Sequence, residues 1–336
     1  MKCKLLAATM LAAATILVGC TTQNNKDNIL IPAGFGEKCG YIDKTGHWVI
    51  NPQFVWANNF AENGLACVKL NGKYGYIDKT GNWVINPQFD WAYNFAEYDL
   101  ACVELNDKWG FIDKTGNWVI NPQFDWADDF ENGLARVGLN GKWGFIDKTG
   151  NWVINPQFDE VWNFAENNLA CAKFGQYGYI DITGKWVINP QFEWVNDFAK
   201  NGLACVELNS KYGYIDNTGK WVINPQFGVA LEFADNGLAA VELDGKWGFI
   251  DKTGKWVINP QFDRAGYFAE NGLAAVELDG KYGFIDKKGN LVVSQQYNDV
   301  MIFENTIFFE QNGKWGIIDK NGNIVANPQF DWVVRK

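Results

Sequence analysis

The residues of this 336-residue sequence that could do chemistry are few: seven cysteines, one histidine and a recurring aspartate. His47 is the single histidine, and it falls in a turn where similar segments have Asn or Lys. No Cys/His spacing typical of metal ligands remains once the cysteines are placed. No glycine-rich phosphate loop precedes a helix, and no helix is evident. The sequence therefore predicts a protein that is not an enzyme and has no cofactor or metal site.

The recurring aspartate appears nine times at intervals of 33 to 35 residues, at Asp43, Asp78, Asp113, Asp147, Asp181, Asp216, Asp251, Asp286 and Asp319. Each one stands before a short run that ends in Gly, and a Lys commonly follows it. A single carboxylate beside a lysine is a poor calcium site. An Asp side chain in a turn can accept backbone N–H groups, so we expect these residues to cap turns.

The cysteines differ in where they lie. Cys3 is in the N-terminal leader and Cys20 directly follows it. Cys67, Cys102, Cys171 and Cys205 share one position in a repeat, where other copies have Arg136, Ala240 and Ala275. A position that accepts Ala or Cys is most simply a small, partly buried strand site. Disulfides between neighbouring copies, Cys67 with Cys102 and Cys171 with Cys205, remain an alternative that requires close α-carbons.

The leader, residues 1–19, has the pattern of a lipoprotein signal peptide. Lys2 and Lys4 precede an apolar stretch, and Leu17-Val18-Gly19-Cys20 resembles a bacterial lipobox with Cys20 as the lipidated residue. The stretch is short for a membrane span. Residues 20–29 then read as a lipidated cysteine and flexible tether. An ordinary cleaved signal peptide is the alternative.

Charge limits the partners that this protein can have. Without residues 1–19 the chain keeps 27 basic and 39 acidic residues, a net charge near −12. Binders of nucleic acid present basic surfaces instead. Anionic lipid would also repel this surface, so lipid on Cys20 is the expected membrane anchor. The residue after Cys20 is Thr21, whereas some lipoproteins that this leader resembles have an Asp there that marks them for retention in the inner membrane. We therefore expect the outer membrane or cell surface.

Residues 30–336 consist of nine copies of one unit, of which residues 100–133 are representative. Ala101 to Leu105 reads as a first strand. Trp109 to Ile112 reads as a second, and Trp118 to Ile120 as a third that Asn121-Pro122 should end. Turns such as Asn71-Gly72 fit type I′ hairpins. Residues 123–133 form the return segment, which leads from the third strand to the next copy. We expect Phe124 and Phe130 to be buried there, and the segment is long enough for a fourth short strand.

Alternation along the second and third strands predicts apolar residues on both faces of this sheet. Such a small meander must be covered by its neighbours, so the unit is a stacking unit. The expected fold is an all-β tandem array of about nine three- to four-stranded meanders, forming an open twisted solenoid, with a closed β-propeller as the alternative. Cys39 in the first copy and residues 294–297 in the eighth depart from the pattern, as capping copies do.

The recurring Lys-Trp-Gly-Phe-Ile-Asp at 108–113, 142–147 and 246–251, with Tyr for Trp at 73–78 and 211–216, resembles the WG-containing (KWG) repeat family of bacteria. The resemblance covers about nine-tenths of the chain. It implies a β-repeat array that is often found at the cell envelope. It implies no catalytic residue and no ligand.

Variation between copies distinguishes two tryptophan positions. The third-strand position holds only apolar residues (Trp48, Trp83, Trp118, Trp152, Trp186, Trp221, Trp256, Leu291 and Ile324), which predicts a core site. The position two residues after the return Phe or Tyr also takes Glu160, Arg264 and Asp299, so it must reach solvent. Five tryptophans occupy it: Trp56, Trp91, Trp126, Trp194 and Trp332.

We call these five residues the tryptophan row. Exposed aromatic residues on one face suggest a contact surface for a protein or for sugar rings. We therefore expect an envelope-anchored protein-interaction or scaffold module, with a glycan- or peptidoglycan-binding lipoprotein as the alternative. In a third interpretation, each tryptophan covers the neighbouring copy and seals the joint between copies.

Overall fold

A computed structural model describes residues 30–330 except 36, 44, 304 and 305. These residues form antiparallel sheets joined by short turns, with one 3-10 turn, η1 (Glu97–Asp99), and no α-helix among them. The chain divides into two compact units, Met1–Val161 and Trp162–Lys336. Within the described part, no helix is long and apolar enough to cross a membrane.

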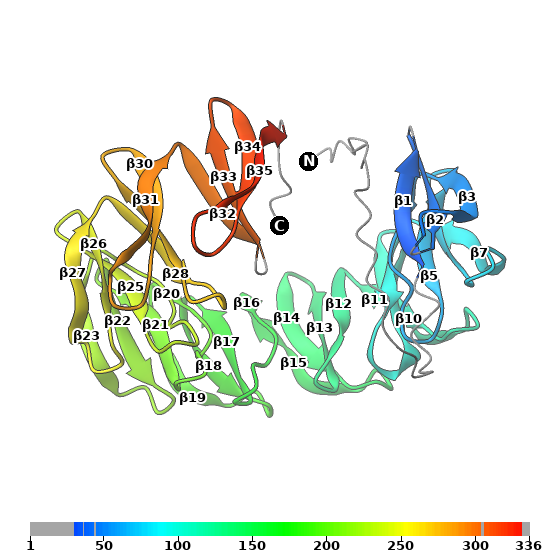
Figure 1. Ribbon diagram of the computed structural model, residues 1–336. Helices are drawn as coiled ribbons and strands as arrows, with labels where there is room; N and C mark the ends of the chain where they lie inside the picture. The colour runs from blue at the N-terminus through cyan, green and yellow to red at the C-terminus, as the bar shows by residue number, and fades with distance from the viewer. Residues whose placement is uncertain (1–29, 36, 44, 304–305, 331–336) are drawn as a thin grey trace, which may run out of the picture. The chain divides into compact units, whose positions relative to one another are not determined.

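Unit 1 contains sheets 1 to 4 (Figure 1). Sheet 1 consists of β1 (Ile31–Phe35), β2 (Lys38–Ile42) and β3 (Trp48–Phe54), and sheet 2 of β4 (Trp56–Ala57), β5 (Ala66–Leu70), β6 (Lys73–Ile77) and β7 (Trp83–Phe89). Sheet 3 consists of β8 (Trp91–Phe95), β9 (Ala101–Leu105), β10 (Lys108–Ile112) and β11 (Trp118–Phe124), and sheet 4 of β12 (Trp126–Glu131), β13 (Leu134–Leu139), β14 (Lys142–Ile146) and β15 (Trp152–Phe158). Strand β16 (Glu160–Val161) follows sheet 4 in the chain.

Unit 2 repeats the same plan. Its strands are β17 (Leu169–Phe174), β18 (Gln176–Asp181) and β19 (Trp186–Phe192); β20 (Trp194–Val195), β21 (Leu203–Leu208), β22 (Lys211–Asp216) and β23 (Trp221–Phe227); β24 (Val229–Ala230), β25 (Ala239–Leu243), β26 (Lys246–Ile250) and β27 (Trp256–Phe262); β28 (Arg264–Phe268), β29 (Ala274–Leu278), β30 (Lys281–Ile285) and β31 (Leu291–Tyr297); and β32 (Asp299–Phe303), β33 (Thr306–Gln311), β34 (Lys314–Ile318) and β35 (Ile324–Phe330).

The predicted all-β tandem array of nine three- to four-stranded meanders is confirmed. The fourth strand exists, but it belongs to the sheet that follows: β8 comes after β7 in the chain and pairs with β9, not with its own copy. Each sheet therefore takes strands from two consecutive copies. This sharing ties successive copies together through backbone hydrogen bonds as well as side chains.

The core consists of layers between successive sheets. We call the layer between sheets 2 and 3 joint 2 and the layer between sheets 3 and 4 joint 3. Joint 2 packs Tyr76 and Phe89 of sheet 2 against Val103 of sheet 3, and joint 3 packs Phe111 and Phe124 of sheet 3 against Val137 of sheet 4. Phe124 and Phe130 are buried as expected. Because each layer needs two sheets, the predicted stacking unit is confirmed within unit 1.

The hairpin turns follow the sequence prediction. Asn71 and Gly72 have φ of 52° and 82°, the left-handed pair that a type I′ turn requires. In the aspartate turns, Asp113 Oδ1 accepts the backbone N–H groups of Thr115 at 2.8 Å and Asn117 at 3.0 Å. A bond from the Thr115 hydroxyl, together with these backbone bonds, holds the pKa of Asp113 below its ordinary value. The expected turn-capping role is therefore observed.

The prediction that Asn121-Pro122 ends the third strand is wrong, because β11 continues to Phe124. Between the pairs Trp109–Phe124 and Phe111–Ile120, the single residue Gly110 lies opposite residues 121–123. Pro122 is tolerated since it sits in this bulge on the outermost strand of the sheet, where no ladder donor is needed.

The bulge also explains the glycine of the Trp-Gly pair. A Cβ on Gly110 would lie 2.6 Å from the Ile120 carbonyl oxygen and 2.8 Å from the Pro122 nitrogen. Backbone atoms cannot yield at such distances, so only glycine fits. The same approach occurs at the equivalent glycine of the first copy, Gly40, and of later copies such as Gly248.

Two further expectations about the third strand are wrong. Val119 is exposed rather than covered, so β11 has one face open to solvent. The third-strand tryptophans are not core residues: Trp48 is exposed and those of the next six copies are half-buried. Trp118, for example, stands edge-on to Phe89 of the preceding sheet, with ring centroids 5.8 Å apart. The position is apolar because its side chain covers the rim of a joint. A side chain at a rim keeps one side in solvent, and Leu291 and Ile324 are accordingly exposed there.

Candidate functional site

The tryptophan row lies at the start of the first strand of each sheet, immediately after the chain crosses from the preceding one. Its described members are exposed to similar extents: Trp56 40%, Trp91 44%, Trp126 44% and Trp194 42%. Trp332 and the lipidation candidate Cys20 lie outside the described residues, as do residues 1–29 generally. The exposure predicted for this position is therefore present in all four described members.

Three of these four rings also touch the sheet before them. Trp91 of sheet 3 lies against Tyr74 of sheet 2, with ring centroids 5.2 Å apart, and Trp126 of sheet 4 lies against Trp109 of sheet 3 at 5.3 Å. In unit 2, Trp194 lies 5.7 Å from Tyr177. The row thus covers joints with part of each ring and presents the rest to solvent.

Hydrogen bonds fix the orientation of some of these rings. The indole N–H of Trp56 donates to Asn58 Oδ1 at 3.0 Å, and that of Trp194 donates to Asn196 Oδ1 at 2.9 Å. A ring held in one orientation loses little conformational entropy when it binds a partner. This preorganisation is a property that a contact surface needs.

The polar neighbours of the row differ in charge between joints 2 and 3. Lys69 lies 4.6 Å above the ring of Tyr74 and 5.9 Å from that of Trp91, a cation–π arrangement at joint 2. Glu104 occupies the equivalent position in sheet 3. It is half-buried, and burial raises its pKa above the ordinary value.

Beside the row, an aspartate connects the two sheets of each joint. At joint 2, Asp90 pairs with the ammonium of Lys73 in sheet 2 and accepts the Asn106 N–H of sheet 3 at 2.9 Å. At joint 3, Asp125 pairs with Lys108 and accepts the Asn140 N–H at 2.7 Å. These contacts lower the pKa of both aspartates. The lysine of the Lys-Trp-Gly sequence is thus part of the joint.

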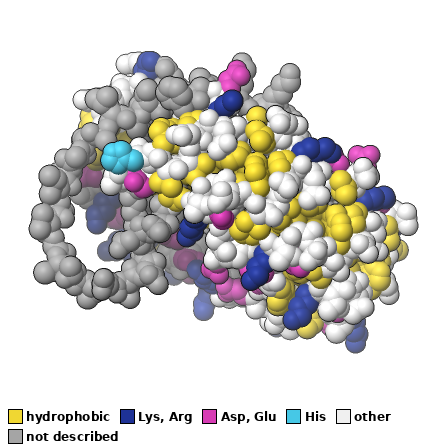
Figure 2. Space-filling view, turned by 90° about the vertical axis from the view of Figure 1, so that its right-hand side faces the viewer, with side chains coloured by type: hydrophobic (Ala, Val, Ile, Leu, Met, Phe, Trp, Pro, Cys, Tyr) yellow, Lys and Arg dark blue, Asp and Glu magenta, His cyan; other side chains and the backbone are white. Residues whose placement is uncertain are grey.

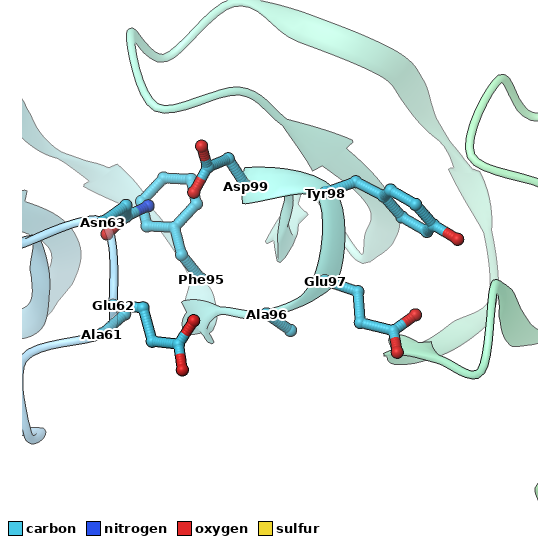
Figure 3. Close-up of a pocket in the computed structure, with 8 residues that line it drawn as sticks. All are labelled: Ala61, Glu62, Asn63, Phe95, Ala96, Glu97, Tyr98 and Asp99. Atoms are coloured by element: carbon cyan, nitrogen blue, oxygen red, sulfur yellow. The ribbon is translucent and has the colours of Figure 1, made fainter.

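A pocket of about 700 Å³ opens at the opposite end of these strands (Figure 3). It is lined by residues 61–63 and 95–99, and three of its side chains, Glu62, Glu97 and Asp99, are carboxylates. In Figure 3 the ring of Tyr98 points away from Glu62. The Glu97 carboxylate accepts hydrogen bonds from the N–H groups of Asn132 and Gly133. One of the three carboxylates of the pocket therefore already binds the backbone of the equivalent turn in the next copy.

Sequence reasoning missed this pocket, although one feature marks it. Most other copies have an Asn-Gly or Asn-Asn pair in this turn, and in the first copy Asn63 accepts the Leu65 N–H at 3.1 Å. In the second copy the pair is Tyr98-Asp99, with φ of 62° and 55°. Bulky residues rarely adopt this conformation, and it commonly costs about 1–3 kcal/mol. The strained turn is a departure from the repeat that the sequence displays.

The repeated cysteines form no disulfide. Cys67, Cys102, Cys171 and Cys205 are all buried free thiols, so the proposed Cys67–Cys102 and Cys171–Cys205 bridges are absent. Each side chain instead points into a joint: Cys67 Sγ donates to the Ala92 carbonyl at 3.4 Å, and Cys102 Sγ to that of Ala127 at 3.5 Å. Burial raises the pKa of Cys67 to about 12. These thiols are structural and unreactive while the joints are closed.

His47 lies in its turn, with Nδ1 2.7 Å from the Thr45 hydroxyl. Among the described residues, no three His, Cys, Asp or Glu side chains are grouped so that they could hold a metal ion. The repeated aspartates are occupied by backbone donors instead.

A second apolar surface was not anticipated. The valine that follows each third-strand tryptophan is exposed in unit 1, at Val49, Val84, Val119 and Val153. Seen from the side of β3 and β7, hydrophobic side chains form broken bands between polar ones rather than one continuous patch (Figure 2). A valine in a β-strand gives no sequence indication of which face it occupies.

Stacked antiparallel meanders with a recurring Trp-Gly strand define a β-repeat protein. The family model described as "WG containing repeat" matches residues 40–74, 74–109, 109–143, 143–176, 177–212, 212–247, 247–282, 282–315 and 315–335. The chain therefore belongs to the WG-containing repeat family, which confirms the resemblance.

Curated proteins provide no match to the chain. Among solved structures, one described as "Crystal structure of the eukaryotic initiation factor" is similar with a TM-score of 0.53 and 13% identity, over 87% of this chain and 93% of that one. Apo AztD from Citrobacter koseri is similar with a TM-score of 0.35 and 12% identity, over 90% and 96%. At such identities the first likeness concerns the fold alone.

Proposed function

We propose that this protein is an envelope-anchored, non-catalytic interaction module that binds another protein through the tryptophan row. The anchor is lipid on Cys20, a role supported by the apolar leader and the Leu17-Val18-Gly19-Cys20 pattern. The acidic balance of the chain disfavours nucleic acid as the partner.

The observation that carries the proposal is the exposure of the row. Four large aromatic rings at equivalent positions keep 40–44% of their surface in solvent, although the position also accepts Glu160 and Arg264. Trp is enriched among the residues that dominate binding energy at interfaces. Within unit 1, Trp56, Trp91 and Trp126 start three successive sheets, which gives an extended partner several equivalent contacts.

A glycan of the envelope is the second candidate, and one observation favours it. The rings of Trp56 and Trp194 are locked by hydrogen bonds to Asn58 and Asn196. A ring fixed in this way can stack against the apolar face of a sugar. The same surface would then bind carbohydrate instead of protein.

The test is a pull-down with the full chain, solubilised in detergent from the membrane fraction, against envelope extracts. The binding variant combines Trp91→Val with Trp126→Val, because Val229 shows that the fold accepts valine there. The control combines Trp83→Leu with Trp118→Leu, because Leu291 occupies that position in another copy.

We expect the wild type and the control to retain a protein that the valine variant loses by more than tenfold. Retention of polysaccharide alone, lost in the valine variant, would select the glycan function. Equal retention by all three proteins would refute a binding role for the row and leave it as a seal of the joints.

A further inference from the structure

Joint 2 contains a second polar side chain, besides Asp90, that connects its two sheets: Asn94 on β8. Its Oδ1 accepts the backbone N–H of Cys67 in sheet 2 at 3.0 Å. Its Nδ2 donates to the carbonyl oxygen of Asn59, which precedes Asn94 by one repeat, at 2.7 Å. An amide can do both because it has a donor and an acceptor.

Joint 3 has Asp129 at the same position. Its carboxylate accepts the backbone N–H of Cys102, the counterpart of Cys67. Its Oδ1 is buried and has no hydrogen-bond partner. In the repeat, this oxygen takes the place of the Asn94 amide nitrogen, and the counterpart of the Asn59 carbonyl is the carbonyl of Asn94 itself. A carboxylate oxygen there can donate only if it carries a proton.

The groups around Asp129 offer no cation to hold it ionised. Asp128 on β12 is negative, and the charge of Arg136 on β13 is directed to Asp128 and to the Val161 carbonyl. From the packed sheets, Cys67 on β5, Tyr76 on β6, Tyr93 on β8 and Cys102 on β9 face it, all of them neutral at ordinary pH.

We propose that Asp129 is protonated when joint 3 is closed, that its O–H donates to the backbone carbonyl of Asn94, and that loss of this proton to solvent loosens the joint. The central polar contact of joint 3 is then sensitive to pH, whereas that of joint 2 is not, because an Asn side chain does not titrate.

The ionisation of the group agrees with this arrangement. Burial, with a smaller contribution from the charge of Asp128, raises the pKa of Asp129 to about 7. A carboxyl whose pKa is higher in the closed state favours closure below the pKa of the open chain, near 3.8, and this contribution declines as the pH rises towards 7. Above pH 7 it is lost.

The buried thiols provide a readout for each joint within one molecule. Cys67 Sγ bonds across joint 2 and Cys102 Sγ across joint 3, so alkylation of each requires its own joint to open. The experiment is pulse alkylation of the full chain with iodoacetamide from pH 5.5 to 8.5, with both peptides quantified by mass spectrometry. The ratio of Cys102 to Cys67 labelling cancels the pH dependence of thiol reactivity itself.

For the wild type we expect this ratio to rise on the order of tenfold to thirtyfold over that range, because the opening equilibrium gains a factor of ten per pH unit until the closed-state pKa is reached. Asp129→Asn, which copies Asn94, should flatten the ratio. Asn94→Asp should make Cys67 labelling rise with pH, and Asp128→Asn should leave much of the pH dependence of Cys102 in place.

A wild-type ratio that does not change with pH would overturn the proposal. So would an unchanged pH dependence in Asp129→Asn. If Asp129→Asn failed to fold, the wild-type profile and the Asn94→Asp variant would still test the proposal. Cys67 labelling that does not rise with pH in Asn94→Asp would contradict the role assigned to the carboxyl.

Discussion

Joints 2 and 3 are built from the same parts and differ in their central polar contact. Both pack an aromatic strand against a Val-rich one, both bury a cysteine, and both carry a Trp–aromatic pair at the rim. Joint 2 is connected through Asn94, which has two partners, whereas Asp129 in joint 3 has one. Copies that are nearly identical in sequence can thus close with different stability.

The comparison also separates shared contacts from individual ones. Sheet 3 takes part in both joints, whereas each rim tryptophan and each connecting aspartate belongs to one. Changes in sheet 3 should therefore open both joints together, and changes at a rim should open one. Alkylation of Cys67 and Cys102 measures the two responses separately.

The largest effect is expected from Gly110→Ala. The added Cβ would meet the backbone of Ile120 and Pro122, so the bulge must open at a cost of about 3 kcal/mol or more. Both thiols should then label faster, by a factor of at least 100. Gly138→Ala is the matched control, because its Cβ would lie 3.5 Å from the nearest atom. Separate behaviour of the two joints in Gly110→Ala would contradict the idea that sheet 3 is common to both.

An intermediate effect is expected from the rim tryptophans. Trp118→Leu removes the edge contact with Phe89 at joint 2, and Trp152→Leu removes that with Phe124 at joint 3. Each loss should cost about 1–2 kcal/mol, from the lost aromatic pair and buried area. We expect Cys67 labelling alone to rise about tenfold in the first variant, and Cys102 labelling alone in the second. Labelling of both thiols in either variant would show that the joints are coupled.

The smallest effect is expected from the connecting aspartates. Asp90→Asn and Asp125→Asn remove exposed ion pairs, which contribute little in water. Their pKa values are lowered, so the contribution is present above the ordinary carboxyl pKa and is lost as the pH falls through the folded value. Each variant should shift the melting temperature by a degree or two at pH 7 and by nothing near pH 3. This direction is opposite to that of Asp129, so a larger shift in acid would be inconsistent with the observed pairing.

Sequence reasoning anticipated the parts of the fold that depend on local chemistry. Turns such as Asn71-Gly72 and the aspartate turn around Asp113 require particular φ values and particular hydrogen-bond acceptors. The residue types within the turn determine both. The exposure of Trp91 was anticipated because other copies place Glu or Arg there. The end of β11 was not, since Pro122 breaks a strand only where its missing N–H would be needed, and that depends on what lies opposite.

The candidate contact surface divides in the same way. Tyr98 and Asp99 depart visibly from the repeat, but only the fold shows that their turn borders a pocket with Glu62. The contact of Trp91 with Tyr74 depends on the fourth strand pairing with the next copy, which no residue of the strand specifies.

By itself, the sequence determined the number of copies, the all-β class, the turn types and the positions that must reach solvent, because repetition displays what each position tolerates. Only the tertiary structure decided that one sheet takes strands from two copies, that the glycine after each aromatic makes room for the backbone of a bulge, and that Asp129 Oδ1 is buried without a hydrogen-bond partner. These outcomes depend on contacts between residues about 10 to 35 positions apart. Burial there changes the free energy of a charge or a methyl group in ways that local sequence does not encode.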